Sequence, residues 1–449
     1  MNKNLLLRIL IPSLCCALLS ACTPPIRKPA AHELQVSANG RFLEKKDGAP
    51  FYYLGDTAWE LFHRLDREEA AIYLENRAKK GFTVIQAVVL AELDGLHSPN
   101  PYGHLPLEGD DPMHPNEAYF EHVDYIVNQA AALGLYIGML PTWGDKFNKK
   151  WGVGPEIFTP DNAEAYGAFL GARYRDKPII WILGGDRNPE DDEDLAIVRR
   201  MAAGLEKGDG GAHLMTYHPQ GASNSAQWFH ADEWLDFNMF QSGHGQQHIP
   251  NYEQNWKNYG LEPVKPTLDG EPRYEDHPIN WKPEMGWFDE WDVRQAAYWG
   301  ALSGACGHTY GDHNIWQMWQ PGRDPISAAR TPWQQAIDHP GAAQMGHMRR
   351  LLTLRPWYRL VPDDDLLASD PSAGAGRIVG AIADDNSFAL LYTPMGDPLE
   401  INAARWQNRS IRAWWFDPRT GDTIAAEAQN GLYQPPTTET ARDWVLVLE

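Results

Sequence analysis

The chain has 449 residues, with 60 acidic against 39 basic side chains and a formal net charge of −21 at pH 7. This acidic balance argues against nucleic acid or an anionic membrane surface as a partner, because like charges repel. The sequence also holds 19 Trp and 18 Tyr. So many aromatic rings suit a large core, and they suit stacking on the faces of sugar rings.

The first 22 residues have the pattern of a bacterial lipoprotein signal peptide. Lys3 and Arg8 give a positive start, and the apolar run from Leu5 to Leu19 is too short for a membrane span of about 20 residues. The run ends in Leu19-Ser20-Ala21-Cys22, which resembles a lipobox. We expect cleavage before Cys22 and a lipid on its thiol. The alternative is an ordinary signal peptide with a chance cysteine.

Residues 23–33 are rich in proline and predict an extended tether. Thr23 is not the aspartate that is linked with inner-membrane retention, so we expect an exported lipoprotein anchored in the outer membrane and facing the periplasm. Cys306 is the one cysteine left in the folded part, which excludes an internal disulfide. The hydrophobic core must therefore stabilise the fold.

Short apolar runs alternate with helical patterns from about residue 50 to 355. Several runs are almost continuously apolar, as expected of strands buried on both faces of a parallel sheet. The predicted strands are Phe51–Trp59, Val84–Leu90, Tyr136–Trp143, Ile179–Asp186, His213–Pro219, Phe237–Gly243, Pro266–Pro272 and His308–Trp316.

Helix start and stop signals lie between these strands. Asp66 and Glu69 have the spacing of a capping box, and Gly81 is a stop signal. Asn116 and the pair Thr159-Pro160 open two further helices. Eight strand–helix units predict an α/β fold, a (β/α)₈ TIM barrel over residues 34–360. An open doubly wound sheet is the alternative, but no strand is followed by a glycine-rich phosphate loop.

Residues 361–449 have a different pattern, without a helical period. Turn signals separate four apolar runs, which predict a small antiparallel β-sandwich. The runs are Ile378–Ile382, Phe388–Thr393, Ile411–Phe416 and Trp444–Leu448. The aromatic side chains at 414–416 suit either docking on the barrel or polysaccharide binding, and we favour docking.

In a barrel of this type the active site lies where the strands end at the carboxyl-terminal face. Carboxylates, aromatics and amides dominate the predicted strand ends, which also include Glu92 and Asp145. The side chains predicted to bind substrate are Asp56, Trp59, Trp143, Arg187, Asn188, His218, Gln241, His244, Arg273, Asp312 and Trp316.

Asp186 and Glu271 are the predicted catalytic pair. Each follows a buried strand and a glycine, each is close to an arginine, and the two end strands four and seven. Hydrolysis of a glycosidic bond needs two carboxyl groups, one to protonate the leaving oxygen and one to act at the anomeric carbon. Carboxylates on strands four and seven face each other across a barrel mouth, as in a large group of retaining glycosidases. The alternative is that Asp186 and Asp269 merely cap loops and pair with neighbouring arginines.

Metal ligands and cofactors are not expected. His97, His104 and His114 lie in one long loop, but their spacing matches no usual metal site. Metal-dependent barrel hydrolases carry two closely spaced histidines after strand one, where this chain has the segment 55–59 without histidine.

Four segments together resemble glycoside hydrolase family 140, the apiosidase-like barrels. They are Asn39–Leu43, Pro50–Leu61, Trp181–Asn188 and Asp269–Pro272. The resemblance runs from about Leu34 to the C-terminus and includes a trailing β domain of the collagen-binding type. It implies a retaining mechanism, with Asp186 as acid/base and Glu271 as nucleophile. It also implies release of apiose from side chains of the pectin rhamnogalacturonan II.

The sequence therefore predicts a retaining glycoside hydrolase that acts on an oligosaccharide or polysaccharide of plant cell walls and needs no cofactor. Two alternatives remain open. One is a sugar-capturing lipoprotein without catalysis, and the other is a metal-dependent barrel hydrolase.

Overall fold

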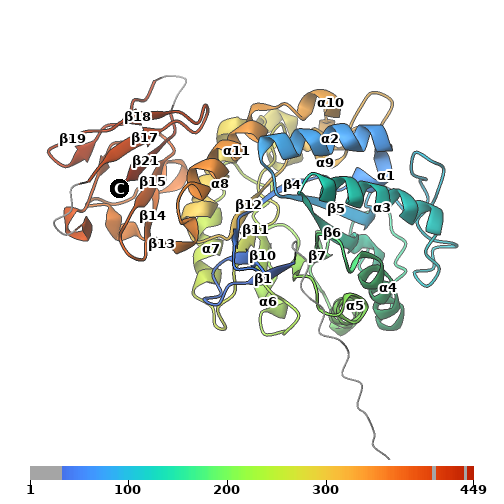
Figure 1. Cartoon of the computed structure of the whole chain (residues 1–449). Helices are drawn as coiled ribbons and strands as arrows, with labels where there is room; N and C mark the ends of the chain where they lie inside the picture. Colours follow the sequence, from blue (N-terminus) through green and yellow to red (C-terminus); the bar gives the residue numbers. More distant parts are fainter. Residues whose placement is uncertain (1–32, 407–410, 439–441) are drawn as a thin grey trace, which may run out of the picture.

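The structure is a computed structural model that describes residues 33–406, 411–438 and 442–449. A larger α/β part and a C-terminal β domain lie side by side, with the C-terminus in the β domain (Figure 1). The predicted signal peptide and nearly all of the tether lie outside the described residues. Among the helices that are described, none has the length and apolar character that crossing a membrane requires.

The main sheet is parallel and has six strands in the order β12-β4-β5-β6-β7-β8. Its strands are β4 (Tyr53–Thr57), β5 (Val84–Leu90), β6 (Tyr136–Thr142), β7 (Ile179–Gly184), β8 (Met215–His218) and β12 (Gly307–Tyr310). A second sheet holds β9 (Ser223–Asn224), β10 (Asn238–Gln241) and β11 (Thr267–Asp269), with β10 and β11 parallel.

Each of the eight predicted strands is present, but they form two sheets instead of one continuous one. Single backbone hydrogen bonds connect the two: Cys306 N–H donates to the carbonyl of Thr267, and Asp236 N–H donates to that of Met215, both at 2.9 Å. The strands at these junctions are only three or four residues long, which leaves no room for a longer ladder. The main sheet thus forms a parallel half-barrel that the smaller sheet extends.

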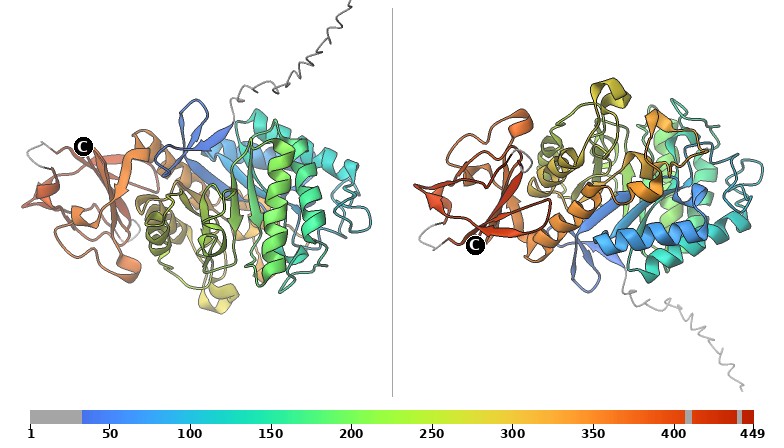
Figure 2. Two further views of the ribbon diagram at one scale, coloured as in Figure 1. Left: turned by 90° about the horizontal axis from the view of Figure 1, so that it is seen from below. Right: turned by 90° about the horizontal axis from the view of Figure 1, so that it is seen from above.

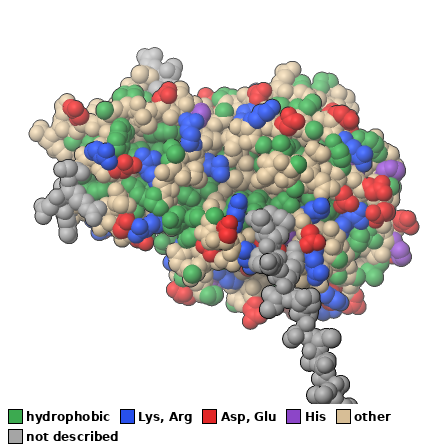
Figure 3. Space-filling model, viewed as in Figure 1, with side chains coloured by type: hydrophobic (Ala, Val, Ile, Leu, Met, Phe, Trp, Pro, Cys, Tyr) green, Lys and Arg blue, Asp and Glu red, His purple; other side chains and the backbone are tan. Residues whose placement is uncertain are grey.

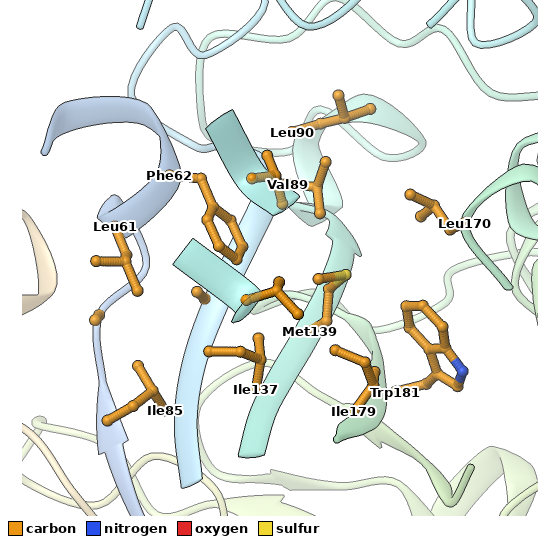
Figure 4. Packing of buried hydrophobic residues seen from close by; sticks show 14 of the residues in the cluster. Leu61, Phe62, Ile85, Val89, Leu90, Ile137, Met139, Leu170, Ile179 and Trp181 are labelled. Atoms are coloured by element: carbon orange, nitrogen blue, oxygen red, sulfur yellow. The ribbon is translucent and has the colours of Figure 1, made fainter. Parts of the chain in front are cut away.

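Alternate side chains of the main sheet enter two different hydrophobic clusters. Ile85, Ile137 and Trp181 belong to the cluster that packs against the surrounding helices, and Figure 4 shows these side chains together with Leu170 of the helical layer. Ile180 and Ile182 point the opposite way, into an interior cluster that also contains side chains of β10 and β11. Both faces of the sheet are therefore buried, which explains its continuous apolar runs.

Eleven α-helices lie among the described residues. They are α1 (Leu61–Arg64), α2 (Arg67–Lys80), α3 (Glu117–Ala132), α4 (Pro160–Tyr174), α5 (Asp192–Asp209), α6 (Ala226–Phe229), α7 (Asn251–Tyr259), α8 (Glu290–Leu302), α9 (His313–Trp316), α10 (Trp333–Ala336) and α11 (Pro340–Thr353). Short 3₁₀ turns occupy Gly144–Lys146, Ile279–Trp281, Pro283–Met285, Ile326–Ala328, Trp357–Arg359, Asp364–Leu366, Gly374–Gly376 and Ala403–Trp406.

The predicted cap of α2 is confirmed. Asp66 accepts the N–H of Glu69 at 2.8 Å, while the Glu69 carboxylate accepts the N–H of Asp66 at 3.1 Å. Gly81 ends the helix in the left-handed region, with φ +88°. The predicted strand His308–Trp316 was too long, because Asp312 accepts the N–H groups of Asn314 and Ile315 and thereby starts α9.

Helices α4 and α5 pack closely through glycines, and they lie side by side in the left view of Figure 2. A Cβ on Gly167 or Gly171 would lie 2.5 or 2.4 Å from a carbonyl oxygen of α5. A Cβ on Gly204 or Gly208 would lie 2.1 or 2.4 Å from a carbonyl oxygen of α4. Any side chain at these four positions would force the two helices apart.

A small N-terminal sheet, which the sequence did not predict, precedes the main sheet. Its antiparallel strands are β1 (Leu34–Val36), β2 (Leu43–Lys45) and β3 (Pro50–Phe51). Leu34, Leu43 and Phe51 enter the interior cluster, so this sheet covers part of the core.

The C-terminal domain contains two antiparallel sheets. The larger sheet holds β13 (Leu360–Pro362), β14 (Val379–Ala383), β15 (Ala389–Thr393), β21 (Trp444–Leu448), β17 (Ala413–Phe416) and β18 (Thr423–Ala425), in that order. The smaller sheet holds β16 (Leu399–Glu400), β20 (Leu432–Tyr433) and β19 (Ala428–Gln429). Side chains of both sheets share one core cluster, in which Leu391 and Trp415 meet Leu399 and Tyr433.

The other face of the larger sheet packs on the α/β part. Val445 and Val447 of β21 share a cluster with residues of α8 and α11, and Phe416 belongs to the same cluster. Arg294 of α8 crosses the boundary and binds the Asp443 carboxylate with two hydrogen bonds, of 2.8 and 3.0 Å. On the face drawn in Figure 3, acidic and basic side chains are interspersed over both parts.

Candidate active site

A cavity of about 630 Å³ opens at the carboxyl-terminal ends of the parallel strands. Asp186 reaches it from the loop after β7, and Glu271 from the loop after β11. The residues that line it are Trp59, Glu92, Trp143, Trp151, Asp186, Gln220, Gly221, Ala222, Gln241, Ser242, Gly243, His244, Gly245, Gln246, Ile249, Glu271, Tyr274, His277, Trp281, Trp316 and Ile326. The two predicted catalytic carboxyls thus share one cavity.

Asp186 occupies an unusual backbone conformation. Gly184 and Gly185 precede it with φ +93° and +100°, and Asp186 itself has φ +53°. A non-glycine residue in the left-handed region costs roughly 1–3 kcal/mol and persists only where its surroundings hold it. Here the N–H of Asp186 donates to Nδ1 of His218 at 3.2 Å, and the indole N–H of Trp151 donates to Oδ2 of Asp186 at 3.1 Å.

Two histidines hold the carboxylate of Glu271. Nε2 of His244 lies 3.0 Å from Oε1, and Nε2 of His218 lies 3.2 Å from Oε2. Nδ1 of His218 accepts the backbone N–H of Asp186, so the proton of this ring is on Nε2 and faces Glu271. Both histidines and the carboxylate are buried.

The two carboxyl groups have opposite pKa shifts. Burial, together with the nearby charge of Glu271, raises the pKa of Asp186 to about 7. Burial also acts to raise the pKa of Glu271, but the hydrogen bonds that His218 and His244 offer to its carboxylate outweigh burial and hold that pKa at about 2. Below about pH 7 the site therefore pairs a carboxyl that retains its proton, Asp186, with a carboxylate that has lost it, Glu271.

Glu92 adds a third carboxyl to the cavity, from the loop after β5. Burial and the neighbouring charges of Asp186 and Glu60 raise the pKa of Glu92 to about 8. A neutral carboxyl at this position has an O–H that can donate a hydrogen bond to a substrate oxygen.

Aromatic rings form much of the cavity wall. Trp59, Trp143 and Trp316 are buried, and the ring centroids of Trp59 and Trp143 lie 5.3 Å apart. Trp281 is 52% exposed and sits at φ +59°, with the rings of His244 and His277 against its edge. An exposed aromatic face beside a cavity that contains carboxyl groups is suited to stacking on a sugar ring.

The structure brings seven of the predicted site residues to the cavity itself. They are Trp59, Trp143, Asp186, Gln241, His244, Glu271 and Trp316. His218 lies behind the wall and contacts Glu271.

Five predicted substrate-binding residues are engaged elsewhere. The side chain of Asp56 points toward α2 and away from the cavity. It binds the buried Arg77 at 2.6 Å and also accepts a hydrogen bond from Tyr73, both of α2. Asp312 caps α9 and contacts His339 at 2.5 Å. These two acidic residues stabilise helix positions and do not line the cavity.

Arg187, Arg273 and Asn188 hold loops. Arg187 donates to the carbonyls of Asn148 and Asp186, both at 2.7 Å, and to that of Trp151. Its guanidinium thus binds backbone and is not paired with the Asp186 carboxylate.

Arg273 points toward α8, where it donates to the Asp292 carbonyl at 2.8 Å and to Gln295 at 2.9 Å. It therefore does not contact Glu271. The side-chain amide of Asn188 donates to the Ser223 hydroxyl at 2.8 Å, and its oxygen accepts the Gln220 N–H at 3.0 Å.

Two of the three histidines of the long loop after β5 have carboxylate partners. His97 contacts Asp94 and Asp110, and His114 contacts Asp111. Within residues 33–406, 411–438 and 442–449, no group of His, Cys, Asp and Glu has the arrangement of a metal site.

Sequence reasoning missed several cavity residues, namely Trp151, Gln220, Tyr274, His277 and Trp281. Trp151 lies between β6 and α4, and the others lie in the loops after β8 and β11. These loops carry no periodic pattern. The one available signal was the presence of tryptophans in loops that follow barrel strands.

Two family profiles match the chain. The profile of the "Apiosidase-like, catalytic domain" family matches residues 37–359, and that of the "Putative collagen-binding domain of a collagenase" matches residues 361–449. None of the curated proteins matches the chain.

Two solved structures are similar over nearly the whole chain. One is described as a glycoside hydrolase, at 34% identity and a TM-score of 0.84, and covers 93% of this chain and 96% of its own. The other, a glycoside hydrolase family 5 protein from Bacteroides vulgatus ATCC 8482, has 31% identity, a TM-score of 0.84 and coverage of 93% and 92%. The chain therefore belongs to the apiosidase-like family of glycoside hydrolases.

Proposed function

We propose that the chain is a retaining glycoside hydrolase with Asp186 as acid/base and Glu271 as nucleophile. The observation that carries the proposal is the opposite protonation of two carboxyls in one cavity, with the pKa of Asp186 at about 7 and that of Glu271 at about 2. A glycosidase needs one group that gives a proton and one that stays ionised, and the surroundings of the two residues differ accordingly.

In the first step, a carboxylate oxygen of Glu271 attacks the anomeric carbon, and the bond from that carbon to the leaving oxygen breaks. The proton of Asp186 passes to the leaving oxygen. In the second step, Asp186, now a carboxylate, takes a proton from water, and the oxygen of this water displaces Glu271 from the anomeric carbon. Glu271 and Asp186 return to their starting protonation states. His218 and His244 lower the basicity of Glu271, which also makes it the better leaving group in the second step.

The proposed substrates are pectic oligosaccharides of plant cell walls, with apiose released from side chains of rhamnogalacturonan II. The resemblance to glycoside hydrolase family 140 in four segments of the sequence supports this assignment. So does the aromatic wall, because aromatic rings can stack on sugars. We further propose that the six strands of the main sheet and the parallel strands β10 and β11 act as one (β/α)₈ barrel, since their side chains share an interior cluster.

We also propose that the protein is exported and anchored by a lipid on Cys22, in the outer membrane and facing the periplasm. The support is the sequence Leu19-Ser20-Ala21-Cys22 after a short apolar run. Residues 361–449 then serve the catalytic part by covering α8 and α11.

A release assay tests the function. Purified protein is incubated with a panel of pectic oligosaccharides that includes apiose-bearing fragments of rhamnogalacturonan II, and the sugars released are identified. We expect a single monosaccharide product, formed first with the anomeric configuration of the substrate, as followed by proton NMR. Inverted product would contradict the retaining mechanism, and binding without release would favour a sugar-capturing lipoprotein.

A further inference from the structure

A second cavity, of about 340 Å³, lies beside the catalytic one. It is lined by His63, Arg64, Glu69, Leu93, Ser98, Pro99, Pro101, Gln320 and Arg323. These residues come from the segments after β4, β5 and β12, which are neighbours in the main sheet. Segments that follow parallel strands lie on the carboxyl-terminal face, so the second cavity opens on the same face as the active site.

Two loops contribute residues to both cavities. Glu92 lines the catalytic cavity and the next residue, Leu93, lines the second one. In the same way Ile326 lines the catalytic cavity, while Arg323 lines the second one. The segments after β5 and β12 thus have residues in the walls of both cavities.

Two guanidinium groups dominate the polar lining. Arg64 donates to the carbonyl of Gln317 at 2.7 Å, and Arg323 donates to the carbonyl of Arg64 at 2.7 Å and to that of Met318. These bonds hold the two guanidinium groups in place. Because backbone carbonyl oxygens carry no full charge, they do not neutralise the charges of the arginines. The nearest carboxylate contact of Arg64 is Glu60, at 3.7 Å.

The remaining charges around the cavity are partly committed elsewhere. Glu60 contacts Nδ1 of His63 at 2.6 Å, while Nε2 of His63 lies 3.0 Å from the Ser98 carbonyl. Glu69 lies on the wall, but its carboxylate accepts the N–H of Asp66 in the cap of α2. Among the residues that line the cavity, two guanidiniums thus stand against one carboxylate, that of Glu69, whereas the Glu60 carboxylate contacts His63 and Arg64 and is not part of the lining.

We propose that this cavity is a second sugar subsite that binds the carboxylate of a uronate residue in the substrate. The inference rests on the proposed glycosidase function and deepens it, because it names the charge of the substrate beyond the cleaved bond. A guanidinium offers two parallel N–H groups that match a carboxylate, and arginines fixed in advance lose little freedom on binding. Burial and the neighbouring charge of Arg64 lower the pKa of Arg323, and an anion between the two arginines relieves that repulsion.

Binding calorimetry on the full chain tests this without requiring turnover. The probes are trigalacturonate and galactotriose, both α-1,4-linked, which then have the same ring and linkage and differ by a carboxylate against a hydroxymethyl group. We expect trigalacturonate to bind about tenfold more tightly, as one charge-assisted pair provides. Arg323→Gln should remove this preference and leave galactotriose binding unchanged. The matched control is Arg200→Gln on α5, an exposed arginine that pairs with Glu164 and should change neither affinity.

A gain-of-binding variant separates recognition from loop support. Glu69→Gln keeps an acceptor for the Asp66 N–H and removes the negative charge on the cavity wall, so trigalacturonate should bind several-fold more tightly. If Arg323→Gln unfolds the loop, which its melting temperature reveals, Glu69→Gln still decides the question. Equal affinity for the two probes, or no gain in Glu69→Gln, overturns the inference. Competition by inorganic sulfate at the concentration of trigalacturonate would instead mark a simple anion site and also overturn it.

The outcomes distinguish this inference from the proposed function. If the protein releases sugars but binds the two probes equally well, the uronate subsite is refuted and the proposed function stands. If the protein prefers trigalacturonate through Arg323 but releases no sugar from any substrate, the proposed function is refuted and the anion preference of the cavity stands.

Discussion

Nε2 of His218 lies 3.2 Å from Oε2 of Glu271, and the opposite nitrogen of the same ring accepts the backbone N–H of Asp186. One imidazole thus connects the loops that carry the two proposed catalytic carboxyls. It holds Asp186 in its left-handed conformation and at the same time favours the ionised form of Glu271.

The roles of the two carboxyls differ in a measurable way. Glu271→Ala should abolish turnover of every substrate, because no group remains to attack the anomeric carbon. Asp186→Ala should slow glycosides with poor leaving groups by about 10²–10⁴-fold and spare the first step for activated aryl glycosides, which leave without protonation. Steady-state and burst kinetics on a pair of such substrates measure this. Equal losses on both substrates in Asp186→Ala would contradict the assignment.

The pH profile should reflect Asp186 on its alkaline side. The general acid is active when protonated, so kcat/KM should fall above a pKa of about 7, whereas Glu271 is ionised above about 2. Trp151 donates to Asp186 and thereby favours its ionised form. Trp151→Phe removes that donor, so the pKa of Asp186 and the alkaline limb should move to higher pH. If the alkaline limb of the profile stays at the same pH or moves to lower pH in Trp151→Phe, this limb does not report the ionisation of Asp186.

Trp281 is expected to bind sugar without taking part in the chemistry. Trp281→Ala should raise KM by about tenfold through the loss of one stacked ring and leave kcat nearly unchanged. Trp281→Tyr keeps an aromatic face and should restore most of the affinity. Substrate saturation curves for the three proteins decide it. A fall in kcat at constant KM would instead place Trp281 in the positioning of the catalytic groups.

The boundary between the two parts depends on a buried ion pair. Arg294→Met leaves the Asp443 carboxylate buried with fewer partners and should lower the free energy of unfolding by about 3–5 kcal/mol. The control Arg199→Met removes a more exposed arginine, paired with Asp232, and should cost under about 1 kcal/mol. Urea denaturation measures both. Similar values for the two variants would contradict the importance of this contact.

The lipid anchor is tested at Cys22. In Cys22→Ser the precursor should lack the acylation site, so the protein should be released from membranes instead of sedimenting with them. Cell fractionation and mass spectrometry of the N-terminal peptide follow the change. Cys306→Ser leaves the lipobox intact and is the control. Normal processing and membrane association of Cys22→Ser would show that the lipobox interpretation is wrong.

Local patterns predicted the elements well where one signal dominated. β5 has its predicted bounds, Val84–Leu90, because an apolar run with Gln86 as its one polar residue lies between a helix stop and a polar loop. Asp66, Asn116 and Thr159 cap the helices that they were expected to open. The division into two sheets was not predictable. The periodicity of a strand does not show whether it forms a continuous ladder of hydrogen bonds with its neighbour.

Site residues were harder to predict than strands. A position at a strand end does not determine which way the side chain points. Asp56 was therefore expected in the cavity, but it binds Arg77 of α2. Proximity in sequence misled for Arg273, whose partners lie on α8 and not at Glu271. The contact of His218 with Glu271 joins residues 53 positions apart, and only the folded chain reveals it.

The glycine contact between α4 and α5 has a consequence for the proton on Asp186. The loop with Trp151 runs into α4, and the loop with Asp186 runs into α5, so the two ends of the Trp151–Asp186 hydrogen bond are each tied to one helix of this pair. Separating the helices by one methyl group, as in Gly204→Ala, would shift both loops relative to each other. Glycines at the contact between two helices, which carry no side chain, would thereby influence the pKa of an acid inside the cavity, and a substitution at these positions would shift the working pH of the site without changing any residue that lines it.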